Sequence, residues 1–345
     1  MVNNQERTSR MRADVLIVGS GLAGSTLGFL LRKSGKDVLA VELRDANDKD
    51  KLCAGAINGE GVSLFDNIYG ADAFESLSPL ASPRAIYRCL DAQHTASIDY
   101  QTLPRKVIDD YCLRRYLCEG GRLVDRASLF GIDVGRHIAT FRNLREGSQF
   151  EVAYETLVGA DGATSAVRRL LSGRNQRVCP SAQGTVPFRG DQFIFDYNPQ
   201  DQGYCWYIPH KEDATVGCML HGATGADCRK RLVEFCAAVN IEVPTLRGAF
   251  IPEGDDILLR AGEDVWLVGD AAGLIDAFGG GGIWHALVSS RVLAAALTGG
   301  TPYELAMEPR IAELALINAS LNTKYVKTCL ITVILASKER ELSEE

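Results

Sequence analysis

Three glycine-rich segments of this 345-residue chain combine residue types that can hold phosphate groups and sugar hydroxyls. Each follows a short apolar run, and each contains or precedes a carboxylate. Glycine lets the backbone come close to an anion, and the N-terminus of a following helix supplies N–H donors and partial positive charge. The segments are Gly19–Gly24 (GSGLAG), Gly159–Arg168 (GADGATSAVR), and Gly269–Gly273 (GDAAG) with Gly279–Ile283 (GGGGI) after it.

The first segment has the spacing of a dinucleotide-binding turn. Gly19 makes the tight turn after a strand, Gly21 lets the backbone approach a pyrophosphate, and Gly24 permits close packing of the helix on the strand. Glu42 ends the next predicted strand, where it can accept hydrogen bonds from a ribose. The glycine spacing predicts a dinucleotide but does not distinguish FAD from NAD.

The second and third segments place a carboxylate at the turn from a strand into a helix. Asp270 is suited to a ribityl hydroxyl or a ribose. Asp161 has two interpretations, a cofactor contact or a helix-capping residue. The run Gly279–Gly282 can present backbone N–H groups at a helix N-terminus to a developing negative charge on a flavin ring.

The elements that position these segments alternate between strand and helix. Residues 14–42 predict a strand, a helix and a second strand, which is a βαβ unit. Residues 1–12 are polar and are expected to be disordered. The other helices are predicted at 57–69, 106–120, 226–239, 283–297 and over most of 302–337, and the other strands within 123–160, 184–220 and 261–268.

This order predicts an α/β protein whose nucleotide-binding domain is interrupted by a second, β-rich one. The expected Rossmann-type domain covers 12–80, 103–172 and 258–300. An inserted antiparallel sheet, the substrate domain, covers 81–102 and 173–257. C-terminal helices cover 301–345, and the apolar positions of 311–337 suit either a helix that closes the core or one that meets a lipid surface.

Composition excludes several classes of function. The net charge of −7 argues against a nucleic-acid partner. The ten cysteines include no C-x-x-C pair, and the five histidines lack metal-ligand spacing, so we expect no metal site and reduced, mostly buried thiols. The apolar stretch Val15–Leu31 contains four glycines and is too short for a membrane span. We expect a cytoplasmic protein, with the membrane surface as the alternative location.

The three motifs in this order, over roughly residues 12–300, resemble the FAD-dependent aromatic hydroxylase superfamily. Two further segments are similar to geranylgeranyl reductases, in particular the short members: Lys51–Ala56 (KLCAGA) and Tyr204–Lys211 (YCWYIPHK), with Gly217 after the latter. Asp276 stands where that family commonly has Asn, and Asp110 where it has an arginine that contacts FAD.

The resemblance implies FAD as the cofactor and assigns roles residue by residue. With an arginine missing at 110, it leaves Arg114 or Arg115 to contact the flavin. It implies Cys53, Tyr204 and Trp206 as catalytic candidates, although a packing thiol and a pair of core aromatic residues are the alternatives. The implied cofactor-binding residues are Gly19, Gly21, Leu22, Ala23, Gly24, Glu42, Leu43, Arg44, Cys53, Ala54, Gly55, Ala56, Arg114, Leu129, Asp161, Gly162, Gly269, Asp270, Gly280, Gly281, Gly282 and Ile283.

The activity that the resemblance implies is reduction of carbon–carbon double bonds in an isoprenoid, polyprenyl or similar apolar substrate by hydride transfer from reduced flavin. Only one GxGxxG is present, so NAD(P)H or a ferredoxin-type carrier is expected as a transient electron donor. A second hypothesis is a flavin monooxygenase or halogenase, because Tyr204-x-Trp206-x-Ile208-Pro209 also resembles a halogenase motif. A third is a flavin-binding protein without catalysis. His210 and His285 are expected to pack or cap.

Overall fold

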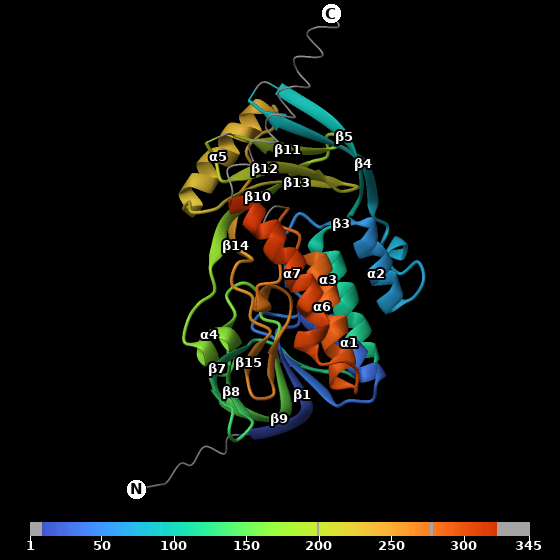
Figure 1. Cartoon of the computed structure of the whole chain (residues 1–345), viewed down its shortest axis with the longest axis vertical. Helices are drawn as coiled ribbons and strands as arrows, with labels where there is room; N and C mark the ends of the chain where they lie inside the picture. Colours follow the sequence, from blue (N-terminus) through green and yellow to red (C-terminus); the bar gives the residue numbers. More distant parts are fainter. Residues whose placement is uncertain (1–8, 91, 199, 277–278, 323–345) are drawn as a thin grey trace, which may run out of the picture.

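The computed structural model describes residues 9–90, 92–198, 200–276 and 279–322. Two eight-stranded sheets form the frame of the molecule. Figure 1 shows the first sheet at the lower end of the long axis and the second at the upper end, with a group of helices alongside. The α/β class with a second sheet, expected from the alternation of strand and helix patterns, is confirmed.

The first sheet has the order β15-β16-β9-β1-β2-β6, and β7 and β8 extend it from β9. Strand β1 begins at Ser9, within the stretch expected to be disordered, because Ser9 to Ala13 pair in parallel with Phe150 to Tyr154 of β9. The strands are β1 (Ser9–Val18), β2 (Val38–Val41), β6 (Arg122–Val124), β7 (Ala127–Asp133), β8 (Ile138–Asn143), β9 (Gln149–Gly159), β15 (Arg260–Gly262) and β16 (Val265–Leu267).

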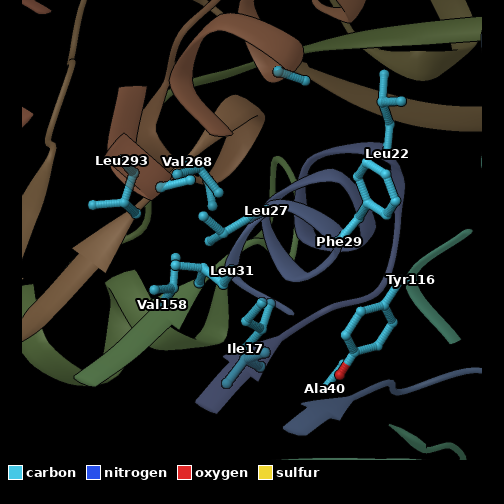
Figure 2. Close-up of a cluster of buried hydrophobic side chains, with 14 of the residues drawn as sticks. Ile17, Leu22, Leu27, Phe29, Leu31, Ala40, Tyr116, Val158, Val268 and Leu293 are labelled. Atoms are coloured by element: carbon cyan, nitrogen blue, oxygen red, sulfur yellow. The ribbon is translucent and has the colours of Figure 1, made fainter. Parts of the chain in front are cut away.

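Most of the helices enclose the larger core with this sheet, whereas α5 (Gly225–Ala238) packs on the second sheet. Figure 2 shows Leu27 and Leu31 of the first helix on the side that faces Val158 and Leu293, and all four are part of one buried cluster. The helices are α1 (Leu22–Lys33), α2 (Gly59–Tyr69), α3 (Arg105–Cys118), α4 (Ala166–Ser172), α5 (Gly225–Ala238), α6 (Ile283–Leu297) and α7 (Tyr303–Asn322), with single 3-10 turns η1 (Glu75–Leu77) and η2 (Gly269–Ala272).

The second sheet has the order β14-β10-β13-β12-β11-β4-β5-β3. Every pair in it is antiparallel except β4 with β11, which is parallel, so the expectation of a purely antiparallel sheet was wrong at this pair. The strands are β3 (Ala56–Asn58), β4 (Leu80–Cys89), β5 (Ala92–Thr102), β10 (Val178–Pro187), β11 (Phe193–Tyr197), β12 (Gly203–Pro209), β13 (Asp213–Leu220) and β14 (Arg247–Pro252).

Strand β3 links the two halves of the fold. It lies in the range expected for the first domain, yet it pairs with β5 in the second sheet. The helix expected from residue 57 therefore begins only at Gly59, and Asn58 caps it by accepting a hydrogen bond from the Gly61 N–H. Segment 51–55 runs immediately before β3.

The C-terminal helix α7 closes the core of the first domain. Tyr303, Met307 and Leu314 are each 1% exposed and belong to the large buried cluster. The rest of the helical stretch expected up to residue 337 lies outside the described residues. Within the described part of the chain, no helix is both long and apolar enough to cross a membrane.

Candidate active site

The turn between β1 and α1 has the shape expected of a phosphate-binding loop. Gly19 has φ +97°, and a Cβ there would lie 2.5 Å from the Ala160 carbonyl oxygen. A Cβ on Gly24 would lie 2.0 Å from the Gly19 oxygen. Gly21, by contrast, faces open space, and helix α1 begins after it with no capping side chain and no acidic residue in its first turn. The first N–H groups of α1 are therefore available to an anion.

Glu42 lies beside this loop. Its Oε2 accepts hydrogen bonds from the Ser20 N–H (2.8 Å) and hydroxyl (3.0 Å), and its Oε1 accepts one from the Arg44 N–H (3.0 Å). The Lys49 ammonium donates to the Ser20 hydroxyl at 2.8 Å and lies 3.9 Å from Glu42. Burial lowers the pKa of Lys49, and the Glu42 charge opposes that shift. The carboxylate is thus held at the loop where a ribose would lie.

Asp161 acts in the structure as a helix-capping residue. Its Oδ2 accepts hydrogen bonds from the N–H groups of Ala166 (2.6 Å) and Val167 (3.2 Å) at the start of α4. Its Oδ1 is buried without a hydrogen-bond partner among the described residues, and burial raises the pKa of the carboxyl. The cap and the cofactor contact are compatible, because one oxygen serves the helix and the other is unused. The neighbouring Gly162 faces open space.

Arg168 ties the second glycine segment to the third. Its side chain is 1% exposed and forms an ion pair with Asp256 at 2.8 Å. It also donates to the Gln176 Oε1 at 3.2 Å, and Gln176 Nε2 in turn donates to the carbonyls of Ala163 (2.5 Å) and Asp270 (2.8 Å). This buried network fixes the two carboxylate turns relative to each other.

Asp270 forms an ion pair across the site with Lys51, at 2.5 Å between Nζ and Oδ2. Burial acts to raise the pKa of Asp270, but the charges of Lys51 and Arg105 outweigh it, so the pKa is lowered. A Cβ on Gly282 would lie 3.1 Å from Asp270 Oδ1. The third carboxylate, the glycine run and segment 51–55 therefore meet at one place.

Arg105 is a site residue that sequence reasoning missed. It is the first residue of α3, its side chain is 7% exposed, and its Nε donates to Asp109 at 2.9 Å. Burial acts against its charge, but Asp109, Cys53 and Asp270 together raise its pKa. The resemblance implies the FAD-contacting arginine at position 110, next to Tyr111, and not at position 105. The signal that could have found it is the Arg-to-Asp spacing of one helical turn at the start of the predicted helix.

Arg114 and Arg115, the two arginines that the resemblance leaves for this contact, also belong to α3, and their contact with a cofactor stays a prediction. Arg114 is exposed on α3. Arg115 donates to the Tyr69 carbonyl and to the Tyr111 hydroxyl, and its guanidinium lies 5.0 Å from the centre of the Phe29 ring. Arg115 is therefore engaged in packing α1, α2 and α3 together.

Other implied cofactor contacts occupy varied positions. Leu43 is 55% exposed beside Glu42, Arg44 is exposed, and Leu129 is buried in β7. Ile283 is buried at the start of α6, directly after the glycine run. The fold does not test whether these four residues contact a cofactor, so their roles stay predictions.

Cys53 lies where segment 51–55 meets both domains. Its sulfur accepts a hydrogen bond from the Gly55 N–H at 3.4 Å, and its carbonyl accepts one from Gln183 Nε2 of β10 at 3.3 Å. Gly55 has φ +69°, and a Cβ there would lie 1.8 Å from the Leu103 oxygen, so only glycine fits. The half-buried thiol is thus held by the second sheet close to Arg105.

Tyr204 and Trp206 face the same side of β12, as their alternation predicts. The Tyr204 hydroxyl donates to the Gly279 carbonyl at 2.9 Å, which joins the second sheet to the glycine run. The Trp206 indole lies over Gly217, where a Cβ would be 2.1 Å from its Cζ2. Both rings belong to a buried apolar cluster, whereas Cys205 and Tyr207 face helix α5 in another cluster.

The two histidines singled out from the sequence are both buried. His285 Nδ1 lies 2.7 Å from the Gly281 carbonyl, within the first turn of α6, as expected for a capping residue. His210 is 3% exposed, lies close to Gly55, and has no ring-nitrogen partner among the described residues. Burial lowers the pKa of both imidazoles.

No disulfide joins the cysteines of the described residues, and all of these cysteines but Cys53 and Cys118 are buried. No group of three or more histidine, cysteine or acidic side chains in the described part of the chain could hold a metal ion.

The residues present fit FAD on structural grounds. The loop at Gly21 is open where a pyrophosphate would approach, Glu42 stands at its side, and Asp161 retains an unused buried oxygen. Asp270 and the glycine run lie at the N-terminus of α6, beneath the aromatic face of the second sheet.

Comparisons with known proteins agree with this geometry. Residues 12–221 match the family model described as "FAD binding domain". A geranylgeranyl diphosphate reductase from Rhodobacter capsulatus is 27% identical over 317 residues, covering 86% of this chain and 78% of that protein. A geranylgeranyl bacteriochlorophyll reductase-like structure from Thermoplasma acidophilum has a TM-score of 0.76 and 20% identity, covering 91% and 88%.

A probable FAD-dependent monooxygenase from Pseudomonas aeruginosa shares the fold as well, with a TM-score of 0.67 and 20% identity, covering 90% of this chain and 93% of that one. Because the family model spans more than half of the sequence, and because the three glycine motifs occupy one continuous site, the chain belongs to the family of proteins with this FAD-binding domain and is an FAD-dependent oxidoreductase related to the geranylgeranyl reductases.

Proposed function

We propose that this protein reduces carbon–carbon double bonds of an isoprenoid, polyprenyl or similar apolar substrate. The observation that carries the proposal is the hydrogen bond from Tyr204 to Gly279. It puts the aromatic face of the second sheet directly against the glycine run of the flavin site. The printed name of the Rhodobacter relative, a geranylgeranyl diphosphate reductase, supports the same class of substrate.

The face of the second sheet beside this hydrogen bond is suited to an apolar chain. It is built from aromatic and aliphatic side chains that make successive ring contacts, such as Tyr204 with Phe195 (5.7 Å) and with Trp206 (5.9 Å). Such rings bind hydrocarbon through area and shape rather than through charge. The buried cluster contains Ala85, Cys89, Ala92, Cys179, Phe193, Tyr197, Tyr204, Trp206, Ile208 and Met219.

Reduction of an alkene requires a hydride on one carbon and a proton on the other. FAD, when bound and reduced, supplies the hydride. The chain must hold the alkene in place, exclude water and supply the proton. Tyr204 is the favoured proton donor because its hydroxyl lies beside the glycine run, 2.9 Å from the Gly279 carbonyl oxygen. Cys53 is the alternative donor from segment 51–55, and Trp206 orients the substrate.

The electron donor belongs to the proposal as well. We infer NAD(P)H or a ferredoxin-type carrier that visits transiently, since the sequence holds one GxGxxG segment. The other proposed partner is the apolar substrate itself. We propose that the protein is located in the cytoplasm and takes up this substrate by peripheral contact with a membrane surface.

The experiment is an anaerobic mixing of reduced protein with geranylgeranyl-containing lipids. Flavin reoxidation in the absence of oxygen, with product formed, supports the reductase. Cys53→Ser and Tyr204→Phe, each compared with Cys118→Ser on the exposed face of α3, identify which side chain the rate depends on.

A second candidate function is a flavin monooxygenase, which the shared fold of the Pseudomonas protein favours. The same experiment separates the two. A monooxygenase gives no flavin reoxidation until oxygen is admitted, and its product then carries an added oxygen atom.

A further inference from the structure

Asp276 organises the glycine run of the flavin site. This residue stands before the run, is partly buried, and forms an isolated bridge with Gly281. Its Oδ2 accepts a hydrogen bond from the Gly279 N–H at 3.2 Å. The carboxylate therefore fixes the orientation of the Gly279 residue from one side.

Tyr204 contacts the same glycine from the other side. Its hydroxyl donates to the Gly279 carbonyl at 2.9 Å. The carboxylate of Asp276 and the hydroxyl of Tyr204 are thus connected through a single residue that has no side chain of its own. Next to it, Gly280 has φ +65°, and a Cβ there would lie 3.6 Å from the Tyr204 hydroxyl, so the backbone passes close to the phenol.

The carboxylate also acts on its surroundings through charge. Burial, and with it the negative charge of Asp276, raises the pKa of Tyr100, Tyr197 and Tyr204. The tyrosines act on one another in the same direction, and Cys179 adds to the effect on Tyr204. Burial lowers the pKa of His285 on helix α6, and the negative charge of Asp276 acts to raise it. The interactions with Tyr204 all favour the protonated form of its hydroxyl.

We propose that Asp276 is a positioning residue that, through the Gly279 peptide, sets the orientation of the Tyr204 hydroxyl and so the proton that Tyr204 delivers to the substrate. The inference rests on the proposed reductase function. It gives a role to a side chain that the proposed chemistry has not otherwise used, at the position where this chain departs from Asn.

One alkene carbon receives a hydride, and with it two electrons, from flavin that a nicotinamide or ferredoxin-type donor has reduced. The other carbon forms a C–H bond with the proton of Tyr204 as the O–H bond breaks. The phenolate regains a proton from water, so that the net change is two hydrogens added to the alkene. Asp276 is not consumed in this step. It holds the Gly279 residue, whose carbonyl accepts the hydrogen bond from the Tyr204 hydroxyl again once the phenolate is reprotonated.

The direct test does not need turnover. In the FAD-loaded protein with 13Cζ-labelled tyrosine, the NMR signal of Tyr204 is identified by its loss in Tyr204→Phe. Asp276→Ala removes the acceptor of the Gly279 N–H and is expected to shift this signal. Asp276→Asn keeps an acceptor oxygen and is expected to leave the Tyr204 signal at its wild-type position. An unshifted Tyr204 signal in Asp276→Ala overturns the inference, whatever the activity.

The second test measures kcat of the variants. Tyr204→Phe is expected to lower kcat about 100-fold, as loss of a general acid does. Asp276→Ala is expected to lower kcat about tenfold, as loss of one hydrogen bond in the machinery does, and Asp276→Asn is expected to restore most of the rate. In a Tyr204→Phe background, Asp276→Ala is expected to have no further effect, because the two residues act through one path.

The control variant is Tyr207→Phe, which removes a hydroxyl from the opposite face of the same strand, where it contacts Arg189 and Gly190. It is expected to change neither kcat nor the Tyr204 signal. The inference is contradicted if Asp276→Ala lowers kcat by the same factor in the wild-type and the Tyr204→Phe backgrounds. A tenfold loss of FAD affinity in Asp276→Ala also contradicts it. If wild-type protein reduces no alkene while Asp276→Ala still shifts the Tyr204 signal, the proposed function fails and the link between the two residues stands.

Discussion

Lys51 and Asp270, 219 positions apart in the sequence, are joined by an ion pair of 2.5 Å. The pair connects segment 51–55, which carries Cys53, to the turn that precedes the glycine run. The sequence predicted these two segments as separate motifs, and the ion pair brings them into one site. Removing either partner changes both the charge of this site and its geometry.

The first prediction concerns acid stability. The pKa of Asp270 is lowered in the folded protein, so its stabilising effect is fully present above the ordinary pKa of 3.8 and is lost as the pH falls through the lower folded value. Lys51→Met is expected to raise that folded value towards 3.8, so that the variant loses less stability than the wild type as the pH falls below 3.8. Urea unfolding of apoprotein at a series of acid pH values measures the shift. Asp270→Asn should remove this pH dependence, and an identical pH profile in Lys51→Met and wild type would refute the account.

The second prediction concerns the adenosine half of the cofactor. Glu42→Ala removes the acceptor of two Ser20 hydrogen bonds and the carboxylate that we expect to accept from the ribose, so FAD binding is expected to weaken at least tenfold. Riboflavin, which lacks the adenosine, should bind both proteins equally. Fluorescence titration of apoprotein measures both affinities. The control is Glu155→Ala, on the exposed ion pair with Arg12. A parallel loss of riboflavin affinity in Glu42→Ala would show that the residue acts on the fold instead.

The third prediction concerns the buried arginine that links two of the carboxylate turns. Arg168→Met is expected to cost about 3 kcal/mol of unfolding free energy, because it leaves Asp256 and Gln176 without their buried partner. Arg174→Met removes a second arginine from the same Asp256, but one that is 66% exposed, and is expected to cost less than about 1 kcal/mol. Denaturant unfolding compares the two. Equal costs would mean that burial of Arg168 contributes nothing.

The fourth prediction concerns the seat of Trp206. Gly217→Ala places a methyl group within the indole and is expected to cost about 1–3 kcal/mol and to shift the tryptophan fluorescence. Gly131→Ala is the matched control, a strand glycine whose Cβ would meet only ordinary contacts with Thr140 at 3.7 Å. Unfolding and emission spectra test both variants. A Gly217→Ala protein with wild-type stability and emission would contradict this packing.

Local patterns predicted the elements and a dinucleotide-binding turn because each depends on residues close in sequence, whereas FAD in particular followed from the family resemblance. The βαβ unit at residues 14–42 follows from a buried strand, a glycine turn and an amphipathic helix, and the structure has them as β1, α1 and β2. The alternation of Tyr204 and Trp206 follows from the two-residue period of a strand, and both face the same buried cluster.

Contacts between distant segments could not be predicted in the same way. Strand β4 pairs in parallel with β11 across more than a hundred residues, and β3 crosses from one domain to the sheet of the other. Arg105 was missed because its electrostatic interactions with Cys53 and Asp270 arise only in the assembled fold. The hydrogen bond between Tyr204 and Gly279 has the same origin.

The most direct test of the central claim is the mass of the product from one anaerobic turnover. Protein reduced stoichiometrically under argon is mixed with a geranylgeranyl lipid, and the extracted lipid is analysed by mass spectrometry. The account predicts a gain of two hydrogens for each double bond reduced, together with reoxidised flavin. Unchanged lipid under argon, followed by a product with an added oxygen once air is admitted, would contradict it and identify a monooxygenase.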